Sequence, residues 1–315
     1  MNNTADSVYR FARTALTPPQ GEGEPAAASA RRGLDPFRAA HTGLLLTRCA
    51  DLRVLDKREA GAKPALIDRA IAACARAAPL YAAAFAERER MLRAFGAAAA
   101  VFALDCAGAV ATGLGYPMAL GQGVALHHLY GTPLIAGSGI KGMLHAYLRA
   151  LPAAQFRPLF QGEAAAPQLD DEQCRNLILE LAFGDTGEAG FVDVADAWVD
   201  PRNVERCDGK AGAGIPAALQ HDVVTPHHGE YLRGSQAFPT DWDQPVPVPF
   251  ISSAGRFHFA LLWRGGDTEF DRALFAALCE WLADALCGTA ERAAAGVGAR
   301  TASGYGYFLR GEATP

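Results

Sequence analysis

The sequence predicts an α+β fold in which strands and helices alternate along most of the chain. Stretches typical of strands lie at residues 101–106, 190–199, 255–263 and 301–310. A helical pattern separates the first of these strands from the second, and another separates the third from the fourth. The order β-α-β-β-α-β is the ferredoxin-like plan, which the RNA-recognition motif (RRM) shares. Many functions use this plan, so fold alone assigns none.

Composition is typical of a soluble globular protein. The 315 residues are 50% hydrophobic, enough for one large domain or two small ones. The formal net charge of −5 argues against a surface coated in positive charge, but it leaves room for a local basic groove. No segment has the ~18 consecutive apolar residues of a membrane span.

The cysteines and the first residues indicate a cytoplasmic protein. The seven cysteines are widely spaced and form no CxxC pair, so reduced and mostly buried thiols are expected. Residues 1–20 lack the apolar core of roughly 7–15 residues that a secretory leader requires. We therefore expect no contact with a membrane.

Three regions are expected along the chain. Residues 1–35 contain several prolines and glycines and are predicted to be a flexible arm. Residues 36–96 are predicted to be a helical extension. Within it, residues 65–95 are rich in Ala, Arg and Glu, and Pro79 is a candidate break. Residues 97–315 are predicted to form the main domain.

The first half of the main domain leads from a strand to a helix. Residues 101–106 are the first strand, and spaced glycines follow at 113–123. The short apolar run 133–135 then enters a helix. Apolar residues between 140 and 148 recur at helical spacing, and Ser138 is the expected N-cap.

The middle of the domain contains a second helix and a long insertion. Residues 171–183 have a helical pattern, and Gly184 stands where a C′ glycine belongs. The following strand is expected to start near Phe191. Residues 201–250 are rich in Gly and Pro, and a long insertion of this kind is usually functional or disordered.

The strand at 255–263 and the helix at 271–287 are the strongest patterns in the chain. Gly288 can stop this helix. Phe257, Phe259 and Trp263 alternate onto one face of the strand. They are either core residues, which we favour, or a platform on which RNA bases stack.

A basic surface is predicted on the helix that starts near Gly137. Lys141, His145 and Arg149 recur at spacing i, i+4 and i+8, with no acid on that face. A helix start favours an anion, and a bound phosphate would remove the penalty of a lysine so near the positive end. We therefore predict contact with a phosphate backbone; the alternative is a capped helix with a solvated basic face. The RNA-binding candidates here are Gly137, Ser138, Gly139, Lys141, Gly142, His145 and Arg149.

The segment does not match a nucleotide-binding P-loop. The P-loop pattern has four residues between its two glycines and a hydroxyl residue after the lysine. Here Gly142 follows Lys141. Nucleotide hydrolysis is not expected.

A second glycine-rich segment spans residues 296–308. Its small residues allow another backbone to approach closely, while Arg300 and Thr301 can donate to phosphates. Tyrosines in the segment can stack on bases. The alternative is a glycine-rich loop before an edge strand. The RNA-binding candidates here are Gly296, Gly298, Arg300 and Thr301.

Together these segments resemble the RAMP superfamily. Residues 137–142, preceded by Gly-Thr-Pro at 131–133, are similar to the glycine-serine-serine-x-lysine-glycine motif that opens the family's first helix. Residues 296–308 are similar to its C-terminal glycine-rich loop. Phe183-Gly184 also fits the family pattern, and residues 222–231 resemble the sixth subunit of the type III-B (Cmr) complex. The resemblance covers about residues 97–310.

This sequence departs from the family pattern at three positions. Ala136 stands where proline is favoured, and Gly139 where a second serine is usual. Both changes affect the geometry of the turn that precedes the helix. Arg300 replaces a common lysine, which keeps the charge and offers more donors.

The resemblance implies a ferredoxin-like RAMP core with a helical N-terminal extension and long inserted loops. It implies a non-catalytic subunit that grips the 3′ part of a CRISPR guide RNA by its backbone, in a complex that also binds target RNA. The implied protein partners are the repeated backbone subunit, the first subunit and the small helical subunit. Target cleavage belongs to the repeated backbone subunit, and no cofactor is implied.

The histidines leave two other hypotheses open. Some RAMP relatives are metal-independent endoribonucleases that process CRISPR repeat RNA with a histidine acid–base, a role that His41, His127 or His145 could fill. A zinc site would need three or four convergent ligands, and adjacent histidines in a strand point to opposite faces. We therefore expect an inserted hairpin or loop that touches RNA or a neighbouring subunit rather than a metal site. The zinc candidates are His221, Asp222, His227 and His228.

Pairs of carboxylates are interpreted as structural. Asp170 and Asp171 are expected to cap a helix. Asp193 and Asp196 lie three positions apart in a predicted strand and would face opposite ways. Asp241 and Asp243 give no stronger indication of a catalytic pair.

Overall fold

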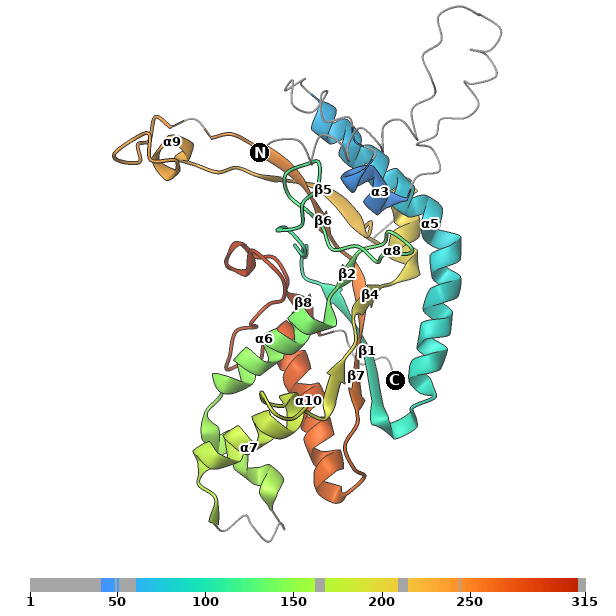
Figure 1. Ribbon diagram of the computed structural model, residues 1–315, viewed down its shortest axis with the longest axis vertical. Coiled ribbons are helices and arrows are strands. Elements are labelled where there is room, and N and C mark those ends of the chain that lie inside the picture. The colour runs from blue at the N-terminus through green and yellow to red at the C-terminus, as the bar shows by residue number, and fades with distance from the viewer. Residues whose placement is uncertain are drawn as a thin grey trace, which may run out of the picture.

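A computed structural model describes residues 41–48, 50, 61–161, 168–208, 215–243 and 245–310. The flexible N-terminal segment expected at residues 1–35 lies outside the described residues. One antiparallel sheet forms the centre of the molecule (Figure 1). Its strands are β1 (Ala99–Cys106), β2 (Leu134–Ile135), β3 (Val192–Val194), β4 (Ala197–Val199), β7 (Arg256–Trp263) and β8 (Phe308–Leu309).

The sheet has the predicted ferredoxin-like topology. The strand order is β2-β4-β7-β1-β8, and β3 also pairs with β7. β1 lies between β7 and β8 and runs antiparallel to both. The main helices connect β1 to β3 and β7 to β8, so the β-α-β-β-α-β order is confirmed.

Two predicted strands are shorter in the structure than in the prediction. Residues 190–199 form β3 and β4, because the regular pairing with β7 is interrupted between Val194 and Ala197. Residues 301–310 are a strand only at 308–309 and begin with the 3-10 turn η6 (Thr301–Ser303). Left-handed backbone at Arg300, Gly304 and Gly306 is incompatible with an extended strand there.

Three helices cover one face of the sheet: α6 (Gly137–Arg149), α7 (Asp171–Phe183) and α10 (Glu269–Cys287) (Figure 1). The aromatic residues of β7 point toward them, with Phe257 and Phe259 fully buried. The Trp263 ring packs against that of Phe275 in α10, with 5.9 Å between the ring centroids. These aromatic residues are therefore core rather than a stacking platform.

Helix α5 (Ala62–Arg93) runs along the opposite face of the sheet (Figure 1). It continues through Pro79, and the nearby Ala78 and Tyr81 are buried in the core. The Tyr81 hydroxyl donates to the Val199 carbonyl at 2.6 Å, and the Phe85 ring lies 4.8 Å from that of His258. α5 thus occupies part of the face that an RRM leaves open to RNA. Helix α3 (Thr42–Thr47) packs against α5.

The long insertion contains more regular structure than its composition predicts. After α8 (Pro201–Glu205) and η5 (Arg206–Asp208), β5 (Leu219–Val224) and β6 (Val248–Ser253) form an antiparallel pair. We call residues 219–253 the arm; its outer part, which contains α9 (Gly229–Leu232), projects from the body (Figure 1). Of the expected alternatives, a hairpin or a loop, the structure shows a hairpin.

Helix ends follow the sequence signals in most places. Asp170 caps α7 in a capping box, as expected, and α7 and α10 end at Gly184 and Gly288. Two 3-10 turns, η2 (Ala153–Gln155) and η3 (Arg157–Phe160), link α6 to α7, and η1 (Gly96–Ala98) links α5 to β1. Within the described ranges, no helix has the length and apolar character needed to span a membrane.

Candidate nucleic-acid interface

The start of α6 differs from the prediction in its cap. Ala136 is the N-cap and Ser138 lies inside the first turn, so the predicted Ser138 cap is wrong. The helix begins earlier because Gly137 packs directly on the turn between β3 and β4. A Cβ at Gly137 would lie 2.1 Å from the Val194 carbonyl oxygen, so only glycine fits there.

An aspartate already occupies the positive end of α6. Asp196 Oδ1 accepts a hydrogen bond from the Gly137 N–H at 2.7 Å. The amides of Gly139 and Ile140 both bond the Ala136 carbonyl. A carboxylate of the protein therefore takes one of the helix-start amides that the prediction left to an external anion.

Asp196 has a structural role that the sequence did not reveal. It lies between β3 and β4, is exposed, and its backbone carbonyl accepts from Arg88 of α5 at 2.8 Å. Asp193 instead pairs with Arg264 at 2.8 Å. Gly137 is 59 positions away from Asp196 in sequence, so no local pattern could have indicated the contact.

One side of α6 is open to solvent. Ser138, Gly139, Gly142 and Arg149 are exposed. A Cβ added at Gly139 or Gly142 would meet no atom within 4 Å, so another molecule can approach the backbone closely at both positions.

The other two basic residues of α6 fold back onto the protein. Lys141 Nζ lies 3.4 Å from the Val192 carbonyl oxygen and 5.9 Å from the centroid of the Phe183 ring. The His145 ring packs edge-on against Phe183, and burial, followed by Arg149, lowers the His145 pKa. Of the predicted basic face, Arg149 is the member that the structure leaves exposed.

The second glycine-rich segment is a tightly packed loop. Gly296, Gly298 and Arg300 all have positive φ. A Cβ at Gly298 would lie 2.6 Å from the Ala111 carbonyl oxygen, and that oxygen accepts from Ala299 N at 2.7 Å. The glycines are thus required by the fold itself, whatever else they do.

This loop rests on the base of the arm. The Arg300 guanidinium lies 5.9 Å from the centroid of the Phe250 ring, and the Tyr305 hydroxyl donates to Asp222 Oδ2 at 2.8 Å. The Tyr307 hydroxyl donates to the Thr301 carbonyl at 3.0 Å. Both tyrosines are therefore engaged within the protein, whereas Arg300 and Thr301 remain partly exposed.

A short segment links the two glycine-rich regions. Ala111 pairs with Ala299 of the loop. The neighbouring Thr112 hydroxyl donates to the Leu134 carbonyl at 3.3 Å, just before α6. Residues 110–135 therefore join the loop to the helix start, and both regions belong to one connected part of the body.

Of the histidines proposed as nuclease candidates, His41 and His127 lie near each other, whereas His145 packs on Phe183 of α7. His41 caps α3 by accepting from Gly43 N at 3.1 Å, and burial, followed by His128, lowers its pKa. The His127 ring stacks on Tyr130 with centroids 4.6 Å apart. Burial also lowers the pKa of His127, against the opposing influence of Asp196.

The histidines of the arm make local contacts. His228 Nδ1 lies 2.7 Å from Asp243 Oδ2, whereas Asp222 bonds Tyr305. In the ranges that the structure describes, no group of three or more His, Cys, Asp or Glu residues is placed to hold a metal ion.

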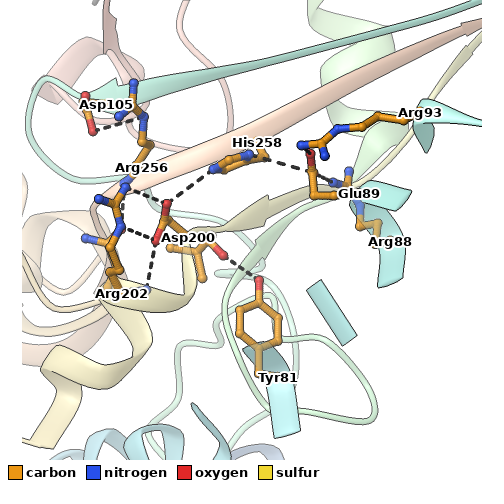
Figure 2. A network of polar contacts seen from close by, with 11 residues as sticks. Tyr81, Arg88, Glu89, Arg93, Asp105, Asp200, Arg202, Arg256 and His258 are labelled. Carbon is orange, nitrogen blue, oxygen red and sulfur yellow. Dashed lines mark hydrogen bonds and ion pairs between the residues drawn. The ribbon is translucent and has the colours of Figure 1, made fainter. Parts of the chain in front are cut away.

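A polar network between α5 and the sheet was not predicted from the sequence (Figure 2). His258 of β7 lies between Glu89 of α5, at 3.8 Å, and Asp200, at 3.5 Å. Arg202 donates to Asp200 at 2.9 and 3.0 Å. Burial raises the pKa of Asp200, but the contacts with His258 and Arg202 outweigh it and leave that pKa well below its usual value. A histidine within a mostly apolar strand was the available signal.

Comparisons with known proteins show the family. The model of the RAMP superfamily matches residues 115–309. A comparison with curated proteins found no match. One similar solved structure is a chain of the type III-B Cmr-beta complex bound to cognate target RNA. Its sequence is 14% identical to this one and the TM-score is 0.44; the alignment covers 99% of this chain and 82% of that chain. Cmr6 from Pyrococcus furiosus is 20% identical, with a TM-score of 0.37 and coverage of 68% and 98%. A chain of a type IV-B CRISPR complex is 15% identical, with a TM-score of 0.37 and coverage of 68% and 93%.

Proposed function

Because this chain belongs to the RAMP superfamily, we propose that it is a non-catalytic, RNA-binding structural subunit of a type III-B CRISPR RNA-guided effector complex. It holds the 3′ part of the guide RNA by its backbone. The observation that carries this proposal is the extent of the family match, because residues 115–309 include both glycine-rich segments. The proposed protein partners are the repeated backbone subunit, the first subunit and the small helical subunit, and the assembled complex binds target RNA.

The geometry of the two segments supports backbone recognition. Gly139 and Gly142 present open backbone, and Ser138 adds an exposed hydroxyl. Arg300, with its guanidinium over Phe250, keeps N–H groups at its edge for a phosphate. Such contacts position an RNA without reading its sequence, as a subunit that accepts any guide requires.

Asp196 changes where the phosphates bind. A phosphate placed directly on the α6 axis would meet the Asp196 carboxylate, which already bonds Gly137. The RNA backbone instead runs along the exposed side of α6, past Ser138 and Arg149. Lys141 joins it when its flexible stem swings away from the 3.4 Å contact with Val192.

The test is a tagged pull-down of the full chain from its native host, with sequencing of the bound RNA and identification of co-purifying proteins. Short RNAs with a constant 5′ tag derived from the CRISPR repeat, together with sister RAMP subunits, are the expected result. A preparation that contains no RNA would overturn the proposal.

The alternative function is a metal-independent RAMP endoribonuclease that processes CRISPR repeat RNA. It would require one histidine, His41, His127 or His145, whose replacement stops cleavage while RNA binding persists. The same pull-down separates the two functions, because a processing enzyme would purify without sister subunits and with cleaved repeat fragments.

A further inference from the structure

The arm is built to present its tip away from the body. Its base is fixed in the core, where Leu219, Phe250 and Ile251 are buried, and Ser253 pairs with Val110. Beyond the β5–β6 ladder, residues 225–243 and 245–247 extend outward from the rest of the molecule (Figure 1). The contacts that stabilise this outer part therefore come from the arm itself.

A cluster of hydrogen bonds gives the tip a defined shape. Asp243 accepts from the Thr240 amide and hydroxyl at 3.1 and 2.9 Å, and it lies 2.7 Å from His228 Nδ1. The Ser235 hydroxyl donates to the Glu230 carbonyl at 2.9 Å. Because the tip is ordered before any partner arrives, little conformational entropy is lost when it docks.

Large apolar side chains are exposed on this tip. Trp242 is 91% exposed, Phe238 75% and Leu232 72%, the three highest values for large apolar residues in the described ranges. Polar contacts hold the backbone around them, and the apolar side chains are left to solvent. Exposed large apolar side chains concentrated on one short projecting segment are typical of an interaction site.

The charge of the arm identifies the class of partner. Residues 219–253 contain the carboxylates of Asp222, Glu230, Asp241 and Asp243 but a single guanidinium, Arg233. Arg233 is paired with Glu230. Surfaces that bind nucleic acid carry an excess of Lys and Arg, so this acidic tip would repel a phosphate backbone. An apolar tip that carries the exposed carboxylate of Asp241 instead complements a protein surface rich in Lys and Arg.

We propose that the tip of the arm docks on another protein subunit of the complex, with Trp242 and Phe238 buried in an apolar pocket that Lys and Arg residues surround. The identification of the partner as a fellow subunit rests on the proposed function. The chemical character of the surface is independent of that function. Trp is among the residues that most often dominate binding energy at the centre of an interface. Asp241, which is exposed and makes no hydrogen bond or ion pair with the described residues, faces the basic rim.

The first experiment uses the complex purified through a tag on this chain. The double variant Trp242→Ser, Phe238→Ser is compared with Phe95→Ser, which removes an aromatic ring that is 52% exposed at the far end of α5. The double variant is expected to lower the amount of one co-purifying subunit at least tenfold, while the guide RNA retained per copy of this chain stays within twofold. The Phe95 control is expected to change neither quantity.

A charge reversal distinguishes a protein partner from RNA. Asp241→Lys is expected to weaken retention of the same subunit, and more strongly at low salt, because two basic surfaces would then meet. If the tip contacted RNA, the same change would add a phosphate contact and tighten RNA retention. Tighter RNA retention with unchanged subunit composition would overturn the proposal, as would no change in either variant.

The outcome also separates this proposal from the proposed function. If the wild-type preparation contains sister subunits but no guide RNA, and the double variant still loses a subunit, the docking surface stands and the RNA-binding function fails. If the wild-type chain purifies without any other subunit, no fellow subunit docks on the tip and the docking proposal fails.

Discussion

Asp196 supplies a carboxylate where the α6 motif, taken alone, favours a phosphate. Its bond to Gly137 at 2.7 Å satisfies one of the free amides at the helix start and complements the helix dipole. RNA recognised here must approach beside Asp196, which makes this residue a probe of where the phosphates lie.

Asp196→Asn is predicted to tighten RNA binding. Asparagine keeps an acceptor for Gly137 and is as good a cap as aspartate, so the free energy of unfolding should stay nearly constant. Removing one negative charge close to a phosphate should increase affinity about two- to fivefold at low salt. Titration of labelled guide RNA against wild-type and variant complexes measures the change. An unchanged affinity would mean that no phosphate lies near the start of α6.

Asp196→Ala is the matched control, because it removes both the charge and the acceptor. It should lower the free energy of unfolding by about 1 kcal/mol, as the loss of a helix cap does. Urea unfolding of the isolated chain measures this difference. Comparing the two variants separates the contribution of the charge to RNA binding from that of the cap to stability.

Lys141→Ala and Arg300→Ala are each predicted to weaken RNA retention. If each residue contacts one phosphate, each variant should also flatten the plot of log affinity against log salt by about one unit. Arg272→Ala is the control, because Arg272 lies on α10 and pairs with Asp267 in solvent. Unchanged affinity and slope in both variants would remove these residues from the interface.

At the scale of elements, the main strands and helices could be predicted, but the packing of α5 on the sheet could not. β1, β7 and α10 carry strong periodic patterns, and each lies within two residues of its predicted position. The contacts of α5 with the sheet join residues far apart in the sequence, such as Tyr81 and Val199, and periodicity carries no information about them. The same limit hid the bond between Asp196 and Gly137 at the candidate interface.

The link between β4, β7 and α5 is predicted to depend on pH through Asp200. Its pKa in the folded chain lies below the usual value, so the ionised carboxylate stabilises the fold at neutral pH. That contribution is full above the ordinary aspartate pKa of about 4 and is lost as pH falls toward the lower folded value.

Asp200→Asn tests this dependence. At pH 7 the variant should lose about 1.5–3 kcal/mol of unfolding free energy, because Arg202 and His258 lose a charged partner. The difference from wild type should narrow as the pH is lowered below about 4, because Asp200 then takes up a proton in the unfolded chain, and at still lower pH in the folded chain as well. Urea unfolding at several pH values measures it. A difference that stays constant with pH would show that the charge of Asp200 does not contribute.

At the scale of the whole molecule, residues 36–96 and 97–315 were predicted to be separate regions. In the described part of the first region, Ile67, Cys74 and Tyr81 of α5 are buried in the same core as the sheet and α10. α8, η5 and the base of the arm also pack against α5. We therefore expect α5 and the ferredoxin-like core to unfold together rather than as two domains.

Two tryptophans report on the two sides of the sheet and make this expectation testable. Trp198 stacks on Tyr81 of α5 with centroids 5.6 Å apart, whereas Trp281 of α10 packs 5.1 Å from Phe156. The experiment uses two variants, each of which keeps one of these tryptophans and has the other tryptophans replaced by phenylalanine. Each variant is titrated with urea. Within each variant, the fluorescence transition should coincide with the loss of far-UV circular dichroism. A Trp198 transition at distinctly lower urea than the circular dichroism would instead show that α5 leaves the sheet first, and that the two regions fold as separate units.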